Sequence, residues 1–157
     1  MSHILCICTG NICRSPMAEV LLQRRLEQEG LTDWQVTSAG TWAVDGHPAS
    51  RHTVRVMADQ GLDLTPHRSR AVTRHIIQEV DLVLAMTHNH VEALRLEFPD
   101  QAANIYLLSE MKDGRRYDID DPYGGSLADY QACASEVTEL IDTGVGRIMS
   151  LARHARE

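Results

Sequence analysis

The N-terminal part of the chain joins an apolar run, a short loop of small and polar residues, and a stretch with helical spacing. The apolar run His3–Ile7 leads directly into Cys8, and the helical spacing starts near Pro16. A strand that enters a helix through so tight a loop brings the unpaired backbone N–H groups of the helix N-terminus to that loop. The sequence therefore predicts an anion-binding loop with the Cys8 thiol in its floor.

The residue types of loop 8–15 suit the binding of a tetrahedral anion. Backbone N–H groups, the helix dipole, Arg14 and the Ser15 hydroxyl all favour the thiolate form of Cys8. Gly10 and Asn11 are residue types that readily adopt left-handed backbone angles, which turn backbone amides inward. Arg14 carries five donors in a rigid fork that matches two phosphate oxygens. The Cys-x5-Arg-Ser spacing thus predicts a nucleophile, amide donors and a guanidinium around one anion.

Two other interpretations of the loop fit the sequence less well. Cys6, Cys8 and Cys13 are close in sequence, and neighbouring thiolates can bind zinc. Their spacing is poor for zinc, and no nearby pair of His or Cys completes four ligands. A nucleotide-binding P-loop is disfavoured because the second Gly and the Gly-Lys-Ser/Thr end are missing. We expect Cys6 to be a core residue.

Length and charge narrow the function classes. A chain of 157 residues suits one domain with a real core. A formal net charge of -7 argues against a nucleic-acid-binding protein. No apolar run approaches 18 residues, there is no basic and apolar leader, and four Cys do not form a secreted disulfide framework. We expect a protein of the cytoplasm.

Apolar runs alternate with helical spacing along the chain, which predicts an α/β fold. The expected strands are Ser2–Cys8, Trp34–Ser38, Asp81–Met86 and Ile105–Leu108. The expected helices are Pro16–Gly30, Ala49–Gly61, a helix capped by Thr87 that ends near Glu97, and Leu127–His154 with an interruption around Gly144–Gly146. His67–Arg74 is expected to be a loop with a short turn. Such alternation predicts a parallel sheet with helices on both faces and Cys8 at a carboxyl end, where ligands bind.

The stretch Cys8–Glu19 resembles the signature of the low-molecular-weight protein tyrosine phosphatases, and the resemblance extends over nearly the whole chain. Other matching stretches are Ser38–Gly40, His67 with Arg70, Asp81–Met86 and Asp121–Tyr123. The resemblance implies a single domain over 1–157 with three layers and four parallel strands in the order 2-1-3-4, the phosphatase loop following the first strand. It also implies a cysteinyl-phosphate mechanism without metal or cofactor.

The resemblance assigns catalysis to Cys8, Arg14 and Asp121. An Asp-rich turn such as 118–121 is, by composition alone, more often a solvated turn, and the family pattern selects the Asp before Pro122 as the acid. Tyr123 resembles an aromatic residue that flanks the substrate channel, and Gly124 stands where many eukaryotic members have a second Tyr. The expected substrate-binding residues are Thr9, Gly10, Asn11, Ile12, Cys13, Ser15 and Tyr123.

Several supporting roles are expected with alternatives left open. Ser38 and His67 resemble residues that hold the loop through Asn11, although a lone His is in general more often a surface residue. Cys13 either traps an oxidised Cys8 as a disulfide or is a packed thiol. Trp42 or Val44 is a candidate for the other wall of the channel. The His88-Asn89-His90 run resembles a metal site only superficially, because i and i+2 on a helix point in different directions.

The leading functional hypothesis is a phosphotyrosine phosphatase that acts on a phosphorylated protein and binds phosphate or another oxyanion in its loop. The alternative is a phosphoarginine phosphatase, a bacterial branch that resembles this chain in Leu82–His88 and Asp121–Ser126 but carries Thr in place of Ile12. An arsenate reductase needs a Cys pair in the middle of the chain, where none occurs. A phosphate-binding module without activity would usually have lost Cys8, Arg14 or Asp121. We expect no nucleic-acid or membrane partner, and a monomer or weak dimer.

Overall fold

A parallel sheet of four strands lies at the centre of the molecule, in the order β2-β1-β3-β4. The computed structural model describes residues 1–157, and every pairing in the sheet is parallel. The predicted strand order is therefore confirmed. The strands are β1 (His3–Cys8), β2 (Gln35–Gly40), β3 (Leu82–Ala85) and β4 (Ile105–Leu107).

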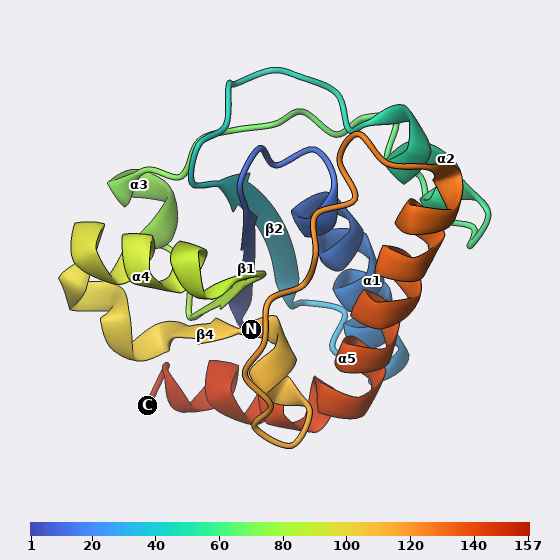
Figure 1. The fold of residues 1–157 in the computed structure, drawn as a ribbon. Helices are drawn as coiled ribbons and strands as arrows, with labels where there is room; N and C mark the ends of the chain where they lie inside the picture. Colours follow the sequence, from blue (N-terminus) through green and yellow to red (C-terminus); the bar gives the residue numbers. More distant parts are fainter.

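Helices cover both faces of the sheet, and the strands divide their side chains between two cores (Figure 1). Ile4, Cys6 and Cys8 of β1 belong to one cluster of buried residues, whereas Leu5 and Ile7 belong to the other. Successive side chains of a strand point to opposite faces, so a strand buried on both sides reads as a continuous apolar run. This is why the run before Cys8 shows no alternation of polar and apolar residues.

The first core is covered by α1 (Arg14–Gln28), α2 (Arg51–Ala58) and α5 (Leu127–His154). The second core is covered by α3 (Arg74–Ile77), by α4 (His88–Glu97) and by Phe98, the residue that follows α4. Two 3-10 helices, η1 (Pro99–Asn104) and η2 (Leu108–Met111), flank β4. The three-layer α/β architecture expected from the sequence is thus present.

The observed ends of the other expected strands and helices lie within three residues of the expected ones, and β2 runs on to Gly40. Three further details of the elements differ from the expectation. Helix α1 begins at Arg14, two residues before Pro16. A proline is tolerated in this first turn because backbone N–H groups there have no intrahelical partner, so the missing N–H of Pro16 costs no hydrogen bond. The short elements α3, η1 and η2 were not predicted, since one or two turns carry too little periodicity. Helix α5 is continuous through Gly144 and Gly146, so the predicted interruption is wrong, although the helix changes direction along its length (Figure 1).

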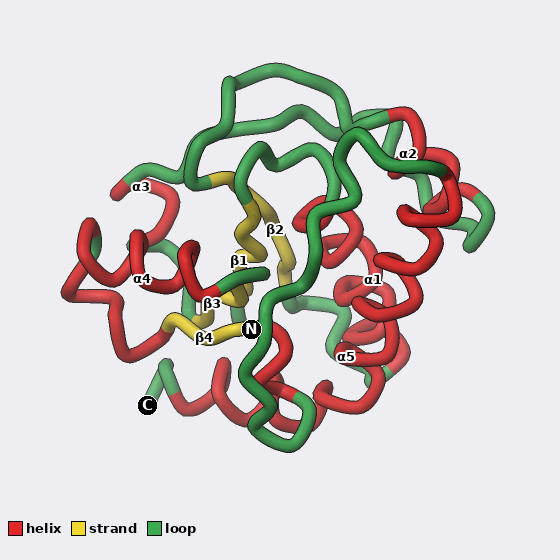
Figure 2. Tube along the Cα trace, in the orientation of Figure 1, coloured by secondary structure: helices red, strands yellow, loops and turns green.

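Loops gather beyond the carboxyl end of β1, where the strand order reverses. The chain leaves β1 toward β2 on one side, and β3 pairs with β1 on the other, so the loop after β1 lies at a switch point. The long loops around residues 41–50 and 112–126 pass close to it in the same view (Figure 2). None of the helices combines the length and the apolar character that crossing a membrane requires.

Candidate active site

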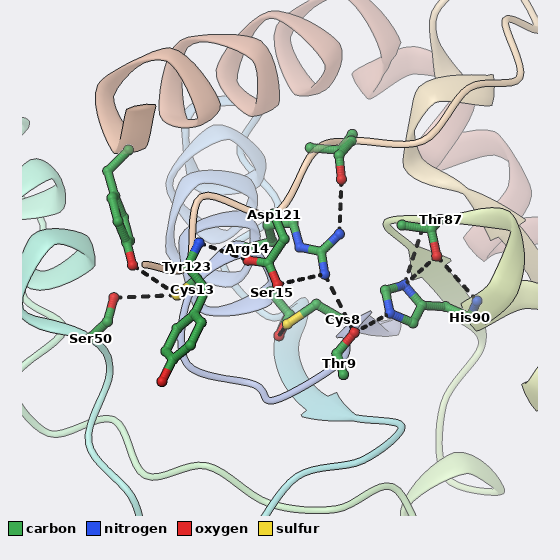
Figure 3. A network of polar contacts seen from close by, with 12 residues as sticks. Cys8, Thr9, Cys13, Arg14, Ser15, Ser50, Thr87, His90, Asp121 and Tyr123 are labelled. Atoms are coloured by element: carbon green, nitrogen blue, oxygen red, sulfur yellow. Dashed lines mark hydrogen bonds and ion pairs between the residues drawn. The ribbon is translucent and has the colours of Figure 1, made fainter. Parts of the chain in front are cut away.

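The thiol of Cys8 lies at the end of β1, on the floor of a cavity of about 210 Å³. Its Sγ is 2.9 Å from the hydroxyl oxygen of Ser15 in the first turn of α1 (Figure 3). Cys8 is only 2% exposed, so it is reached through this cavity. The cavity is lined by Cys8, Thr9, Gly10, Ile12, Cys13, Arg14, Asp121 and Tyr123.

Asn11 fixes the turn of the loop from behind the cavity. Its φ of 57° lies in the left-handed region, and its Nδ2 donates to the hydroxyls of Ser15 (2.8 Å) and Ser38 (2.9 Å). Its Oδ1 accepts from the backbone N–H of Arg70 at 3.0 Å. Gly10 is not in the left-handed region, so the expectation for this pair holds for Asn11 alone. The side chains of Asn11 and Ser15 are buried behind the cavity and do not line it.

A further set of polar groups supports Asn11. Nε2 of His67 is 2.7 Å from the carbonyl oxygen of Asn11, and the hydroxyl of Ser38 donates to Glu19 Oε1 at 2.8 Å. Burial raises the pKa of the Glu19 carboxyl above its ordinary value. The structure therefore places Ser38 and His67 in contact with the loop, and it adds Glu19, for which the sequence analysis offered no role.

Arg14 is nearly completely buried and holds its guanidinium between the loop and the segment before Asp121. Its Nη1 donates to the carbonyl oxygen of Ile119 at 2.8 Å, and its Nη2 lies 3.4 Å from Asp121 Oδ2. Its Nε is buried and has no hydrogen-bond partner in the protein. A buried donor of this kind fits a ligand oxygen, because native structures rarely leave such groups unsatisfied.

Asp121 and Tyr123 stand at the mouth of the cavity, on the loop that precedes α5. Asp121 Oδ1 accepts from the backbone N–H of Tyr123 at 3.1 Å, which fixes the carboxyl group beside the opening. Tyr123 is 69% exposed, and its ring forms one rim of the cavity. A half-exposed carboxyl group beside a buried thiol has the placement that a proton donor to a leaving group needs.

Besides lining the cavity, Cys13 contacts the residue that precedes α2 and a residue of α5. Its thiol donates to the Ser50 hydroxyl at 3.4 Å, and its Sγ is 3.5 Å from the hydroxyl oxygen of Tyr130. Burial raises the pKa of Cys13, which favours the thiol form. These contacts describe a packed thiol, and a disulfide with Cys8 stays a prediction. Cys6 and Cys133 are buried in the core, as expected.

Trp42 and Val44 do not line the cavity of Cys8. Both are exposed, and they line an adjoining groove of about 490 Å³ that shares Gly10, Ile12 and Tyr123 with the cavity. Trp42 and Val44, which were expected to form the other wall of the channel, therefore lie in the adjoining groove and not in the cavity of the thiol.

His90 contacts the loop after β1, a role that the sequence did not predict. It is 5% exposed at the start of α4, and its Nε2 lies 2.8 Å from the hydroxyl oxygen of Thr9 (Figure 3). The signal was the His88-Asn89-His90 run, which had been considered only for metal binding. His88 instead contacts Asp118 at 2.7 Å, and no group of three or more His, Cys, Asp or Glu side chains is arranged for a metal ion.

Comparison with known families rests on nearly the whole chain. The sequence model described as "Low molecular weight phosphotyrosine protein phosphatase" matches residues 3–153. The chain belongs to this family. The resemblance read from the loop signature is thereby confirmed, and the relatives of this chain are named as protein phosphatases.

Relatives within this phosphatase family carry two different substrate names. A probable low molecular weight protein-tyrosine-phosphatase, EpsP of Ralstonia solanacearum, is 34% identical over 148 residues, covering 94% of this chain and 97% of EpsP. A protein-arginine-phosphatase of Bacillus subtilis (strain 168) is 38% identical over 138 residues, covering 88% and 91%. Overall identity therefore does not separate the two substrates.

A solved structure of the family shares the whole architecture. The YwlE arginine phosphatase, as a cysteine-to-serine variant with a phosphorylated active-site serine, superposes with a TM-score of 0.89 at 34% identity. The match covers 98% of this chain and 99% of that one. The fold of this phosphatase is thus that of its family along its full length.

Proposed function

We propose that the protein hydrolyses phosphotyrosine in phosphorylated proteins through a cysteinyl-phosphate intermediate. The observation that carries the proposal is the convergence of three side chains on one cavity. Cys8 lies in the floor, Arg14 at the side and Asp121 at the mouth, although Asp121 is over a hundred positions from the other two. Nucleophile, anion binder and proton donor are the three parts that displacement of a phosphoryl group requires.

In the first step the thiolate of Cys8 attacks phosphorus from below, and the bond from phosphorus to the phenolic oxygen breaks. Asp121 gives its proton to the leaving oxygen, so that a neutral phenol departs. The amides of loop 8–15, the N-terminus of α1 and the Arg14 guanidinium bind the equatorial oxygens, whose charge they stabilise in the transition state.

In the second step the roles of the carboxyl group reverse. Asp121, now a carboxylate, takes a proton from a water molecule while the water oxygen attacks phosphorus. The bond from phosphorus to sulfur breaks, the Cys8 thiolate is restored, and inorganic phosphate leaves. The Ser15 hydroxyl, 2.9 Å from Sγ, can donate to the departing thiolate and so stabilise it.

The YwlE variant supports Cys8 as the group that accepts the phosphoryl. In that protein a serine that replaces the active-site cysteine carries a phosphate. In this chain, the cysteine in the floor of the cavity is Cys8, at the end of β1. A serine hydroxyl at this position forms an oxygen–phosphorus bond in place of the sulfur–phosphorus bond, and an alkoxide leaves phosphorus less readily than a thiolate does.

The walls above the thiol favour an aromatic substrate. Ile12 lines the cavity and Tyr123 forms its exposed rim, so that an aryl ring entering toward Cys8 would contact apolar surface on two sides. Aromatic side chains pair favourably in offset or edge-to-face arrangements. Ile12 offers no hydroxyl or carboxyl group to a guanidinium. These contacts support phosphotyrosine over phosphoarginine.

Phosphoarginine is the second candidate substrate, and two observations favour it. The arginine phosphatase of Bacillus subtilis is as similar to this chain as the tyrosine phosphatases are. Asp121 at the mouth, with its carboxyl group partly exposed, offers an acceptor for guanidinium N–H groups. The two candidates share every step of the mechanism and differ only in the leaving group.

A direct comparison of the two substrates tests the proposal. Phosphate release would be measured from a phosphotyrosine peptide and a phosphoarginine peptide of the same sequence, with wild type and with Ile12→Thr. We expect wild type to prefer phosphotyrosine in kcat/KM by about tenfold or more, since small changes in a pocket wall are worth factors of this size. Ile12→Thr should narrow that preference.

The outcomes show which of the two substrates is preferred and whether the protein is an active phosphatase at all. Cys8→Ser provides the blank for each peptide. A wild-type preference for phosphoarginine would transfer the proposal to the second candidate and would exclude Ile12 as the selecting residue. Release from neither peptide, with folded protein, would overturn the proposal as a whole.

The proposal extends to the setting in which the protein acts. We propose that residues 1–157 work as a single domain in the cytoplasm, as a monomer or weak dimer. All four cysteines are free, which is typical of proteins from reducing compartments. Size-exclusion chromatography with light scattering over a range of concentrations tests the oligomeric state.

A further inference from the structure

The first turn of α4 reaches the phosphate-binding loop through His90. The ring is almost completely buried and does not line the cavity of Cys8. One ring nitrogen contacts Thr87 and the other contacts Thr9 (Figure 3). Its Nδ1 lies 3.2 Å from the backbone nitrogen of Thr87, and its Nε2 lies 2.8 Å from the hydroxyl oxygen of Thr9. His90 therefore links the start of α4 to the loop after β1 by a side-chain hydrogen bond.

The hydrogen-bond partners fix which nitrogen of His90 carries the proton. The backbone N–H of Thr87 can only donate, so Nδ1 must accept and carries no hydrogen. In a neutral ring the proton is then on Nε2, which donates to Thr9 Oγ1. Burial and the nearby charge of Arg14 lower the pKa of His90 to about 4, which keeps the ring neutral near pH 7.

Thr9 carries this contact to the guanidinium of Arg14. Its Oγ1, which accepts from His90, also lies 3.5 Å from Arg14 Nη2. The same Nη2 is 3.4 Å from Asp121 Oδ2, so the oxygen of Thr9 sits beside the end of the guanidinium that faces the proposed acid. The opposite end of Arg14 is held by the carbonyl of Ile119. Thr9 is thus the second of two neutral acceptors that set the plane of the guanidinium.

We propose that His90 is a positioning residue of the phosphatase site: by donating to Thr9, it orients the Thr9 hydroxyl and, through it, the guanidinium of Arg14 toward the phosphoryl group. Without the bond from His90, the Thr9 side chain can rotate away and leave Nη2 to swing toward Asp121. The inference rests on the proposed function, because it assigns a consequence to the anion-binding role of Arg14.

The two nitrogens of His90 allow the positioning role to be separated from the capping of α4. The cap uses Nδ1 and the backbone of His90 with Thr87, whereas the contact with Thr9 uses Nε2 alone. In His90→Asn, the amide oxygen can occupy the place of Nδ1 but nothing reaches Thr9. In His90→Gln, the longer side chain can bring an N–H donor to the place of Nε2.

The test compares these two variants with wild type. Hydrolysis of p-nitrophenyl phosphate and phenyl phosphate would be measured, together with inhibition by inorganic phosphate. We expect His90→Asn to lower kcat/KM about tenfold for both substrates alike and to weaken phosphate inhibition, as the loss of a hydrogen bond near a charged group would do. His90→Gln should recover most of the loss. Asn89→Ala, on the exposed side of the same turn, should equal wild type.

Substitutions of Thr9 provide the second line of evidence. Thr9→Val removes the hydroxyl and should reproduce the loss of His90→Asn, whereas Thr9→Ser keeps the oxygen and should lose clearly less kcat/KM than Thr9→Val. The double variant Thr9→Val with His90→Asn should lose no more than either single variant, because both act through one contact. Where His90→Asn fails to fold, the pair Thr9→Val and Thr9→Ser decides, since neither alters the cap of α4.

Several outcomes would overturn the inference. These are wild-type kinetics in His90→Asn, a loss confined to phenyl phosphate, no rescue by His90→Gln, or losses in the double variant that multiply. A loss confined to the poorer leaving group would locate the effect at Asp121 instead of Arg14. An inactive wild type would overturn the proposed function, whereas an active wild type with unaffected His90 and Thr9 variants would overturn this inference alone.

Discussion

At the scale of single residues, the anion-binding loop depends on an asparagine whose side-chain amide and backbone carbonyl oxygen both have partners. The side chain of Asn11 donates to Ser15 and Ser38 and accepts from Arg70, and its carbonyl oxygen lies 2.7 Å from a ring nitrogen of His67. Its φ of 57° costs an ordinary residue about 1–2 kcal/mol. Asparagine is among the few residues that tolerate this angle and can also supply these hydrogen bonds.

Substitution of Asn11 separates the backbone angle from the hydrogen bonds. Asn11→Gly keeps the left-handed angle without strain but loses the side chain, so we expect a loss of about 2–4 kcal/mol in the free energy of unfolding. Asn11→Ala should lose about 1 kcal/mol more, because it adds strain. Urea denaturation measures both. Equal stability of Asn11→Gly and wild type would show that the hydrogen bonds do not hold the turn.

The role of Asp121 is tested by the chemistry of the leaving group. Asp121→Ala should lower kcat for phenyl phosphate by about 10²-fold or more, and far less for p-nitrophenyl phosphate, because p-nitrophenolate is a good leaving group that departs without protonation. Asp120→Ala is the matched control, because Asp120 is the adjacent carboxylate and does not line the cavity of Cys8. Equal losses on both substrates in Asp121→Ala would exclude it as the acid.

At the scale of elements, the sequence predicted the long helices and the buried strands, but it did not predict the short helices. The apolar run before Met86 and the Thr87 cap place β3 and α4 close to their observed bounds. Helix α3 spans only one turn, and η1 and η2 are too short to show a period. The contact between His90 and Thr9 joins residues 81 positions apart, which no local pattern encodes.

The start of α4 gives the protein a component of acid sensitivity. His90 has a pKa of about 4 in the folded protein against an ordinary value of 6.5. As pH falls from about 6.5 to about 4, the unfolded chain binds a proton that the folded protein does not, so stability is lost over this interval, by up to about 3 kcal/mol. Above pH 6.5 this component is constant.

Thermal unfolding of wild type and His90→Gln between pH 7.5 and pH 4.5 would measure this component. His90→Gln should be less stable than wild type at pH 7.5, because the glutamine cannot serve both Thr87 and Thr9. The difference should shrink as the pH falls, since only wild type carries the histidine. A difference that stays constant over the interval would show that His90 does not resist protonation.

At the scale of the whole molecule, the parallel topology explains why one site could be expected from the sequence. The carboxyl ends of parallel strands meet at one edge, so Cys8 after β1 and the loops after neighbouring strands were expected there. The sequence does not show which contacts hold loops that are distant in the chain next to one another. Arg14 reaches the carbonyl of Ile119 across 105 positions, and Asp118 reaches the start of α4 across 30. These contacts depend on the packed fold.

Helix α5 shows the same limit, because two glycines close in sequence have different surroundings. Gly144 is buried against η2, where an added Cβ would lie 2.5 Å from Met111 Cβ and 2.8 Å from its carbonyl oxygen. Gly146 is exposed, and a Cβ there would meet nothing within 4 Å. The sequence suggested a break at both positions. In the structure, Gly144 permits a close approach between α5 and η2, whereas Gly146 faces no other element.

Alanine substitution of the two glycines should therefore change stability in opposite directions. Gly146→Ala should raise the free energy of unfolding by about 0.5–1 kcal/mol, since alanine favours a helix interior over glycine. Gly144→Ala gains the same helix propensity but forces α5 away from η2, and overpacking of this kind costs about 1–3 kcal/mol, so a net loss is expected. Urea denaturation of the two variants measures the difference directly. If Gly144→Ala were as stable as Gly146→Ala, the contact between α5 and Met111 would not limit how closely the C-terminal helix packs on the rest of the molecule.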